Sequence, residues 1–196
     1  MQVERVGNGV VVMRGVSWDS YQRLDADRHG KKWPRLAYLD GELEIMSPTS
    51  HAHELRKTLL ARLVEAYAEE RSIELNGAGN TTFANRARRV GLAPDECYFV
   101  GDRDCSKEPP QLAIEVSFTP RGVDKLEIYR RLGVQEVWFW SKEQLLIYLR
   151  SGRSYALAAE SELLPALDMT DLSRLIATAN FNRQTSIVRA YRTSLR

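Results

Sequence analysis

The sequence predicts an α+β domain in which helices flank a mixed β-sheet. Leucines and Tyr67 recur at every fourth position over 55–67, which is the spacing of an amphipathic helix. Short runs rich in valine, isoleucine and aromatic residues follow that helix, and turn-forming or charged residues separate them. Helical and strand-like segments therefore alternate along the chain, which predicts one α/β or α+β layer built on a mixed sheet.

The predicted elements begin with a helix over 17–28, for which Ser17 is the N-cap. Two strands within 35–47 meet at an Asp40–Gly41 turn, and the long amphipathic helix then runs from about 50 to 71. Short strand candidates come next, at 72–75, 81–84, 89–94, 97–100 and 111–117.

The second half of the chain repeats this alternation. A helix is predicted over roughly 122–132, and Gly133 provides its stop. Strands at 136–140, 145–150 and 154–160 and a short helix at 171–179 complete the compact part. We expect one domain over residues 1–178, followed by a basic tail over 179–196.

The composition is that of an ordinary globular protein, with 43% hydrophobic and 28% charged residues among 196. No apolar run is long enough to cross a membrane. The two cysteines, Cys97 and Cys105, are expected to be free thiols, which predicts a cytoplasmic location.

Basic residues gather in two places, although the net charge is only +2. Arg86, Arg88 and Arg89 form one cluster, and the 179–196 tail contains arginines but no acid. Such patches attract phosphate groups, so both are candidate nucleic-acid contacts. The alternative for each is a solvated loop or a frayed tail.

Two acids stand in unusual positions. Glu115 lies within the apolar strand 111–117, where an unpaired charge would cost on the order of several kcal/mol. Asp95 follows Pro94 at the start of another apolar strand. If the two strands pair, both carboxylates meet at one end of the sheet, and oxygen ligands of this kind suit Mg²⁺ or Mn²⁺.

Lys125 begins the helix after Glu115 and could reach the same point. An ammonium group there could polarise a water molecule or stabilise a developing oxyanion. Structural alternatives stay open: Asp95 as a turn-capping acid, Glu115 in an ion pair with Lys125 or Arg121, and Lys125 as a surface residue.

A proline–aspartate pair, a strand acid and then a lysine form an order that resembles the PD-(D/E)XK nuclease superfamily, which has the restriction-endonuclease-like fold. Longer blocks resemble one bacterial family in it, the Uma-type restriction endonucleases. These blocks, which cover most of 17–177, are "YLDGELEIMSPTSHAHE", "APDECYFV", "LAIEVSFTPRGVDKLEIYRRLGVQEVWFW" and "LLPALDMTDLSRLI". The fold that this likeness implies is a mixed β-sheet flanked by helices.

The resemblance implies that Asp95 and Glu115 are the metal-binding acids and that Lys125 is the catalytic lysine. The sequence departs from the superfamily pattern at Ser117, where the lysine would ordinarily stand. In the Uma-type family that lysine is taken to have moved onto the helix, which fits Lys125.

The resemblance also marks residues upstream. Glu42 matches a recurrent family acid that would complete the metal shell or orient a water, and Glu44 on the same side of the strand competes for that role. The structural alternative for Glu42, beside Gly41, is an exposed hairpin acid. His53 matches a frequent family histidine, although a helix-start or subunit-contact role is the stronger expectation.

The function expected is a metal-dependent endonuclease that hydrolyses DNA with Mg²⁺ or Mn²⁺. The alternative is an inactive nuclease-fold module that binds nucleic acid or oligomerises. A third hypothesis is a nuclease that acts on RNA or on branched or damaged DNA. The aromatic strand 136–140 is compatible with a homodimer.

Overall fold

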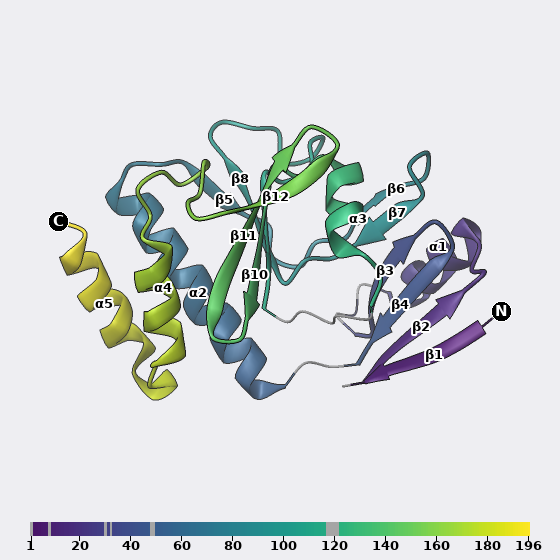
Figure 1. The fold of residues 1–196 in the computed structure, drawn as a ribbon, viewed down its shortest axis with the longest axis horizontal. Coiled ribbons are helices and arrows are strands. Elements are labelled where there is room, and N and C mark those ends of the chain that lie inside the picture. Colours follow the sequence, from purple (N-terminus) through teal and green to yellow (C-terminus); the bar gives the residue numbers. More distant parts are fainter. Residues whose placement is uncertain (1, 8, 30, 32, 48–49, 117–121) are drawn as a thin grey trace.

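The computed structural model describes residues 2–7, 9–29, 31, 33–47, 50–116 and 122–196. Its described strands form two six-stranded sheets, and five α-helices pack around them (Figure 1). This architecture confirms the predicted α+β class. It differs from the prediction in one respect, because the strands divide between two sheets instead of building one layer.

The first sheet is antiparallel throughout, in the order β1-β2-β4-β3-β7-β6. Its strands are β1 (Gln2–Gly7), β2 (Val10–Arg14), β3 (Arg35–Leu39), β4 (Glu42–Met46), β6 (Phe83–Asn85) and β7 (Val90–Leu92). Neither β1 nor β2 was among the strands predicted from the sequence. The charged residues of β1 give no clear alternation, and they are tolerated because β1 is an edge strand.

The helix α1 (Trp18–Asp27) begins at Ser17, whose side chain accepts a hydrogen bond from Ser20 N–H, as the sequence predicted. It packs on the first sheet through aromatic side chains. The rings of Tyr21 and Tyr38 stack with centroids 4.9 Å apart.

The second sheet has the order β12-β11-β10-β9-β8-β5 and is mixed. Its strands are β5 (Leu75–Gly77), β8 (Glu96–Val100), β9 (Leu112–Glu115), β10 (Glu136–Ser141), β11 (Gln144–Ser151) and β12 (Ser154–Ala158). The strands β9 and β10 run parallel because α3 (Lys125–Leu132) lies between them in the chain, whereas the other neighbours are antiparallel.

The predicted strand at 72–75 is shifted. Backbone N–H groups of Arg71 and Ser72 still donate to the last turn of α2 (His51–Glu70), and Ser72 is left-handed, with φ 54°. The strand β5 therefore starts only at Leu75.

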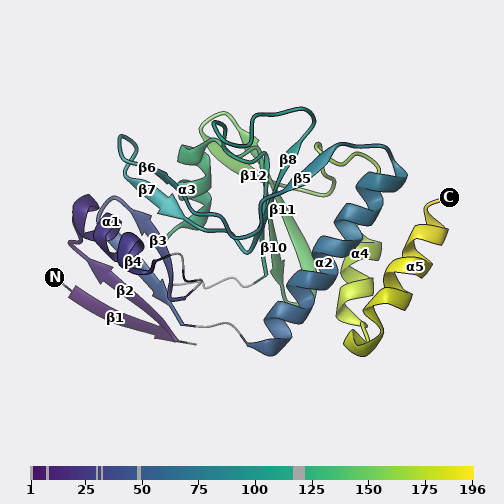
Figure 2. The ribbon, with the colours of Figure 1, turned by 180° about the vertical axis from the view of Figure 1, so that it is seen from behind.

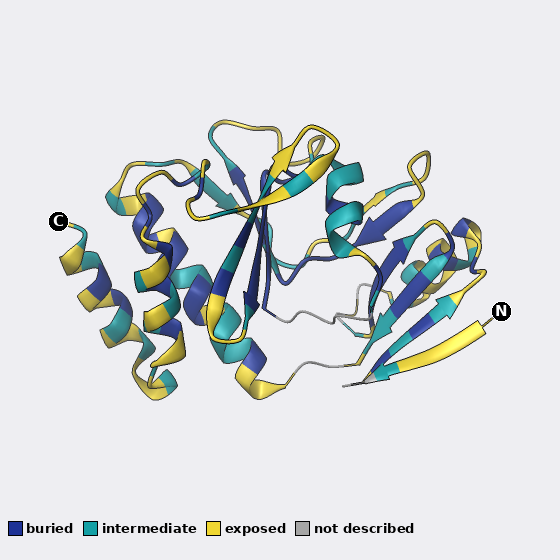
Figure 3. Ribbon diagram, in the orientation of Figure 1, coloured by how far each residue is buried: buried dark blue, intermediate teal, exposed yellow. Residues whose placement is uncertain are grey.

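Besides the cluster between α1 and the first sheet, two core clusters cover the faces of the second sheet. On one face of the second sheet, α2, α4 (Met169–Ala177) and α5 (Gln184–Ser194) cover a core that includes Leu63 and Trp138 (Figures 1 and 2). On the other face, a second core lies between α3 and strands of both sheets. Figure 3 shows that the central strands of both sheets are largely buried. The two sheets therefore meet beside α3.

The segment 179–196, expected as a basic tail, contains a short 3-10 helix (Phe181–Arg183) and α5. Val188 and Tyr191 are buried in the core under α2. Arg192 and Arg196 form ion pairs with acids of α2. Part of the positive charge of this segment is therefore neutralised within the chain. None of the helices in the described ranges is long and apolar enough to cross a membrane.

Candidate active site

The pairing of β8 with β9 brings Asp95 and Glu115 to the same end of the second sheet. The register places Glu96 opposite Ile114, so the residue before β8 lies opposite the last residue of β9. The N–H of Val116 donates to Oδ2 of Asp95 at 2.7 Å. Both carboxylates are only 1% exposed. The structure therefore brings together two acids that lie twenty positions apart in the chain.

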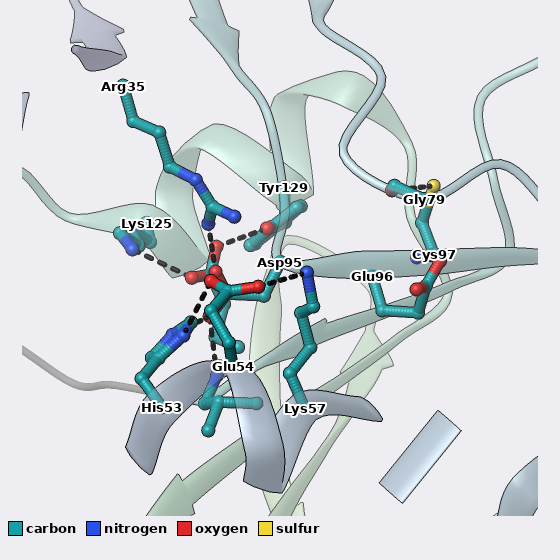
Figure 4. Close-up of polar contacts among 12 residues, drawn as sticks. Arg35, His53, Glu54, Lys57, Gly79, Asp95, Glu96, Cys97, Lys125 and Tyr129 are labelled. Atoms are coloured by element: carbon teal, nitrogen blue, oxygen red, sulfur yellow. Dashed lines mark hydrogen bonds and ion pairs between the residues drawn. The ribbon is translucent and has the colours of Figure 1, made fainter. Parts of the chain in front are cut away.

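Asp95 connects three elements of the fold (Figure 4). Arg35, at the start of β3, forms an ion pair with Oδ1. The Nε2 atom of His53 in α2 lies 3.0 Å from Oδ2. Since Asp95 itself precedes β8, this carboxylate joins the first sheet, the second sheet and α2. Removing it would leave Arg35 as an unpaired buried charge.

Glu115 is held by α3. The Nζ atom of Lys125 lies 2.8 Å from Oε2, and the hydroxyl of Tyr129 donates to Oε1 at 2.5 Å. These partners are four positions apart and share one face of the helix. Burial, together with the charge of Glu115, raises the pKa of Tyr129 well above its ordinary value, so the phenol is a neutral donor. The buried strand acid is thus fully partnered by one helix.

A third carboxylate approaches from β4. Glu44 is completely buried, and its Oε2 accepts a hydrogen bond from the N–H of Val123 at 2.8 Å. Burial raises the pKa of Glu44; the positive charge of Lys125 opposes that shift, and the negative charge of Glu115 adds to it. Its Oε1 has no hydrogen-bond partner among the residues that the structure describes.

Glu42 occupies a different environment from Glu44, although the two belong to the same strand. Its side chain is 42% exposed and pairs with Arg14 at 2.9 Å on the surface of the first sheet. Of the two acids that the sequence left in competition, the structure therefore places Glu44 near Lys125 and Glu115.

His53 lies in the first turn of the long helix α2, and its backbone N–H donates to the side chain of the N-cap Ser50. Its Nδ1 atom lies 3.2 Å from Glu54, while its Nε2 atom faces Asp95. Burial lowers the pKa of His53, which favours the neutral ring. A neutral imidazole has one N–H, so it can donate to only one of these two carboxylates at a time.

Sequence reasoning missed two members of this site. Tyr129 carried a signal that could have revealed it, since it stands four positions after Lys125 on the same helix face. Arg35 carried none, because no local pattern distinguishes a buried arginine from a surface one at the start of a strand. Ser117, the position of the superfamily lysine, and Arg121, the alternative partner of Glu115, lie outside the described residues.

The basic cluster of the sequence is divided. Arg86 is largely exposed and pairs with Asp19 of α1 at 3.0 Å. Arg88 and Arg89 instead line a cavity at the C-terminal end of α3. The structure therefore separates Arg86 from the other two arginines.

The ligand atoms available at this site are of the type that a hard divalent cation prefers. Asp95, Glu115 and Glu44 offer carboxylate oxygens, and Oε1 of Glu44 is a buried acceptor that lacks a partner. In the described part of the chain, no group of three or more His, Cys, Asp or Glu side chains is arranged to hold a metal ion. The oxygens of Asp95 and Glu115 are directed at protein donors. A bound cation would therefore have to replace some of these contacts.

A family model described as "Putative restriction endonuclease", named Uma2, matches residues 18–181. The chain belongs to the Uma2 family. This match confirms the family likeness drawn from the sequence blocks. It covers the whole second sheet and the first sheet apart from β1 and β2. No curated protein matches the chain. The description of the Uma2 family points to a nuclease and hence to DNA and a divalent metal, and the acidic site lies within the matched region.

Proposed function

We propose that the chain is a metal-dependent endonuclease that hydrolyses DNA phosphodiester bonds. The observation that carries the proposal is the meeting of Asp95, Glu115 and Lys125 at one end of the second sheet. Two carboxylates beside a lysine are the groups that metal-assisted phosphodiester hydrolysis requires. Membership in the Uma2 family supports the same reaction class.

In this proposal Asp95 and Glu115 hold Mg²⁺ or Mn²⁺, with the carbonyl of Val116 and the free oxygen of Glu44 as further ligands. The ion would supply positive charge that neutralises the phosphate and lowers the pKa of a bound water. Asp95 and Glu115 are catalytic residues in this sense, and the surrounding side chains keep both carboxylates oriented.

Lys125 has the second catalytic role. Its side chain is only 10% exposed, so its charge acts in a medium that screens weakly. When a phosphate enters, the ammonium can donate to a non-bridging oxygen and stabilise the developing negative charge. Tyr129 and Arg35 are positioning residues, because each holds one of the carboxylates.

Contacts away from the reaction centre would supply affinity without reading sequence. Arg86, Arg88 and Arg89 are proposed to contact backbone phosphates. A homodimer would allow two sites to cut two strands. DNA is the preferred substrate, and RNA and branched DNA are the competitors to be tested beside it.

The direct test is cleavage of supercoiled plasmid with Mg²⁺ or Mn²⁺. Wild type should nick or linearise the plasmid, whereas Asp95→Asn, Glu115→Gln and wild type in EDTA should not. Glu108→Gln, an exposed surface acid, is the matched control and should cut normally. Equal cleavage by wild type and Glu115→Gln would discard the assignment.

One observation favours a second candidate function, that of an inactive nuclease-fold module for nucleic-acid binding or oligomerisation. Asp95 is paired with Arg35 and Glu115 with Lys125, so each of these two carboxylates is neutralised without a metal. Calorimetric titration with Mn²⁺ separates the two functions. A metal site that disappears in Asp95→Asn supports the nuclease, and the absence of any Mn²⁺ binding supports the module.

A further inference from the structure

A strongly basic cavity lies at the end of α3 that is farthest from Lys125. Its volume is about 480 Å³, and it is open to solvent. Five of its seven lining residues are arginines. The lining is Asp40, Ala87, Arg88, Arg89, Arg130, Arg131 and Arg150.

These arginines come from three separate parts of the chain. Arg88 and Arg89 lie in the turn between β6 and β7, Arg130 and Arg131 in the last turn of α3, and Arg150 in β11. Basic residues in the last turn of a helix are favoured by its dipole, which accounts for the α3 pair. The dipole does not account for arginines that other elements bring to the same cavity.

The wall of the cavity is held by directed contacts. Arg131 pairs with Oδ2 of Asp40 at 2.7 Å and with Glu127 at 2.6 Å. Arg131 also donates to the carbonyl of Arg88 at 3.1 Å, and Arg88 donates back to the carbonyl of Arg131. The turn and the helix are thus joined, so a ligand would meet guanidinium groups that are already placed.

The charges in this cavity do not balance. Asp40 and Glu127 are the carboxylates paired with these arginines, which leaves an excess of three positive charges. Among the described residues, neither Arg88 nor Arg150 pairs with a carboxylate. Several guanidinium groups around one small volume repel one another unless an anion enters.

We propose that this cavity binds a phosphate group of DNA. Guanidinium groups match phosphate oxygens with paired hydrogen bonds, and an open, polar, cationic cavity suits a doubly ionised or backbone phosphate better than an apolar ligand. Phosphate binding is inferred from the lining of the cavity. The choice of DNA as the source of that phosphate rests on the proposed function.

The position of the cavity sets how it would be used. Arg131 lies six positions after Lys125 in α3, a rise of roughly 9 Å along the helix. Successive phosphates of one strand are about 3.4 Å apart along the duplex axis. The phosphate in the cavity is therefore not the phosphate that reacts at the site of Asp95, Glu115 and Lys125. It anchors the substrate without taking part in the reaction.

The test measures binding in EDTA, in a Glu115→Gln background, so that cleavage cannot interfere. Sodium pyrophosphate is titrated by calorimetry, and a fluorescent DNA duplex by anisotropy. Arg88→Gln and Arg150→Gln should each weaken both interactions by about tenfold, the scale of one lost charge-assisted hydrogen bond. Each should also make the dependence of log K on log salt shallower by about one.

Arg153→Gln is the matched control. It removes the same charge from an exposed position three residues after Arg150, outside the cavity. It should change either affinity by less than about twofold. Thermal unfolding of every variant checks that the fold is retained; Arg150 is exposed and its side chain carries no described contact that folding needs.

Each outcome decides a different point. Loss of binding in Arg88→Gln and Arg150→Gln but not in Arg153→Gln supports the site. An equal loss in all three, or no pyrophosphate binding by the parent, overturns it. Pyrophosphate binding that DNA cannot displace keeps the phosphate site and overturns DNA as its source. A nuclease that fails the plasmid test can still pass this one, because no step of it requires cleavage.

Discussion

The Nζ atom of Lys125 lies 2.8 Å from Oε2 of Glu115, and the side chains are 10% and 1% exposed. This pair explains how a carboxylate is tolerated in the core of a strand, since an ammonium and the Tyr129 hydroxyl replace the water that it lost. The same contact places an amine at the acidic site.

Lys125→Met should destabilise the fold strongly, because it leaves the Glu115 carboxylate buried without its ion-pair partner. We expect a loss of about 3–5 kcal/mol in the free energy of unfolding, measured by urea denaturation near neutral pH. The double variant Lys125→Met with Glu115→Gln should recover part of that loss. A single variant as stable as wild type would show that the pair is not formed in solution.

Tyr129→Phe removes the second donor to Glu115. A hydrogen bond to a charged group contributes about 1.5–3 kcal/mol, so a loss of stability in that range is expected. Tyr155→Phe is the control, since its hydroxyl donates at 2.7 Å to the neutral carbonyl of Val134 and should cost about 1 kcal/mol. Urea denaturation of the two variants measures both; equal losses would contradict the charged contact.

Glu44→Gln and Glu42→Gln form a matched pair on one strand. Glu44 has a buried oxygen without a described partner near Lys125, whereas Glu42 is exposed and paired with Arg14. We expect Glu44→Gln to weaken Mn²⁺ binding by about 10–100-fold in calorimetry and to slow plasmid cleavage. Glu42→Gln should change neither. The reverse result would return the role to Glu42.

Glu136 predicts a pH dependence of stability. Burial raises its pKa above the ordinary 4.5, although Ser161 and the N–H of Glu162 donate to it. A carboxyl group with a raised folded-state pKa contributes stability that is present below about pH 4.5 and lost as the pH rises through the folded-state pKa.

Glu136→Gln cannot ionise, so its free energy of unfolding relative to wild type should increase from about pH 5 to about pH 8. Urea denaturation at several pH values measures this difference. Glu160→Gln, at an exposed position of the same region, is the control and should show no such trend. A difference that does not vary with pH would rule out an effect of Glu136 ionisation.

Local patterns predicted much of the fold. The Ser17 cap, the turn before Glu42 and the Gly133 stop all occur where the sequence placed them, because each depends on residues close in the chain. The prediction was incomplete for β1, β2 and α5. Charged residues interrupt the apolar alternation of β1. The arginines of the last segment mask the apolar face of α5, which carries Val188 and Tyr191.

The sequence by itself determined which residue types could carry chemistry: an acid after Pro94, an acid inside an apolar strand and a lysine at the next helix start. Tertiary structure alone decided that Glu44 and not Glu42 approaches them, that Arg35 pairs with Asp95, and that five arginines share one cavity. The physical reason is that these outcomes depend on strand register and on burial, which are set by packing between segments distant in the chain.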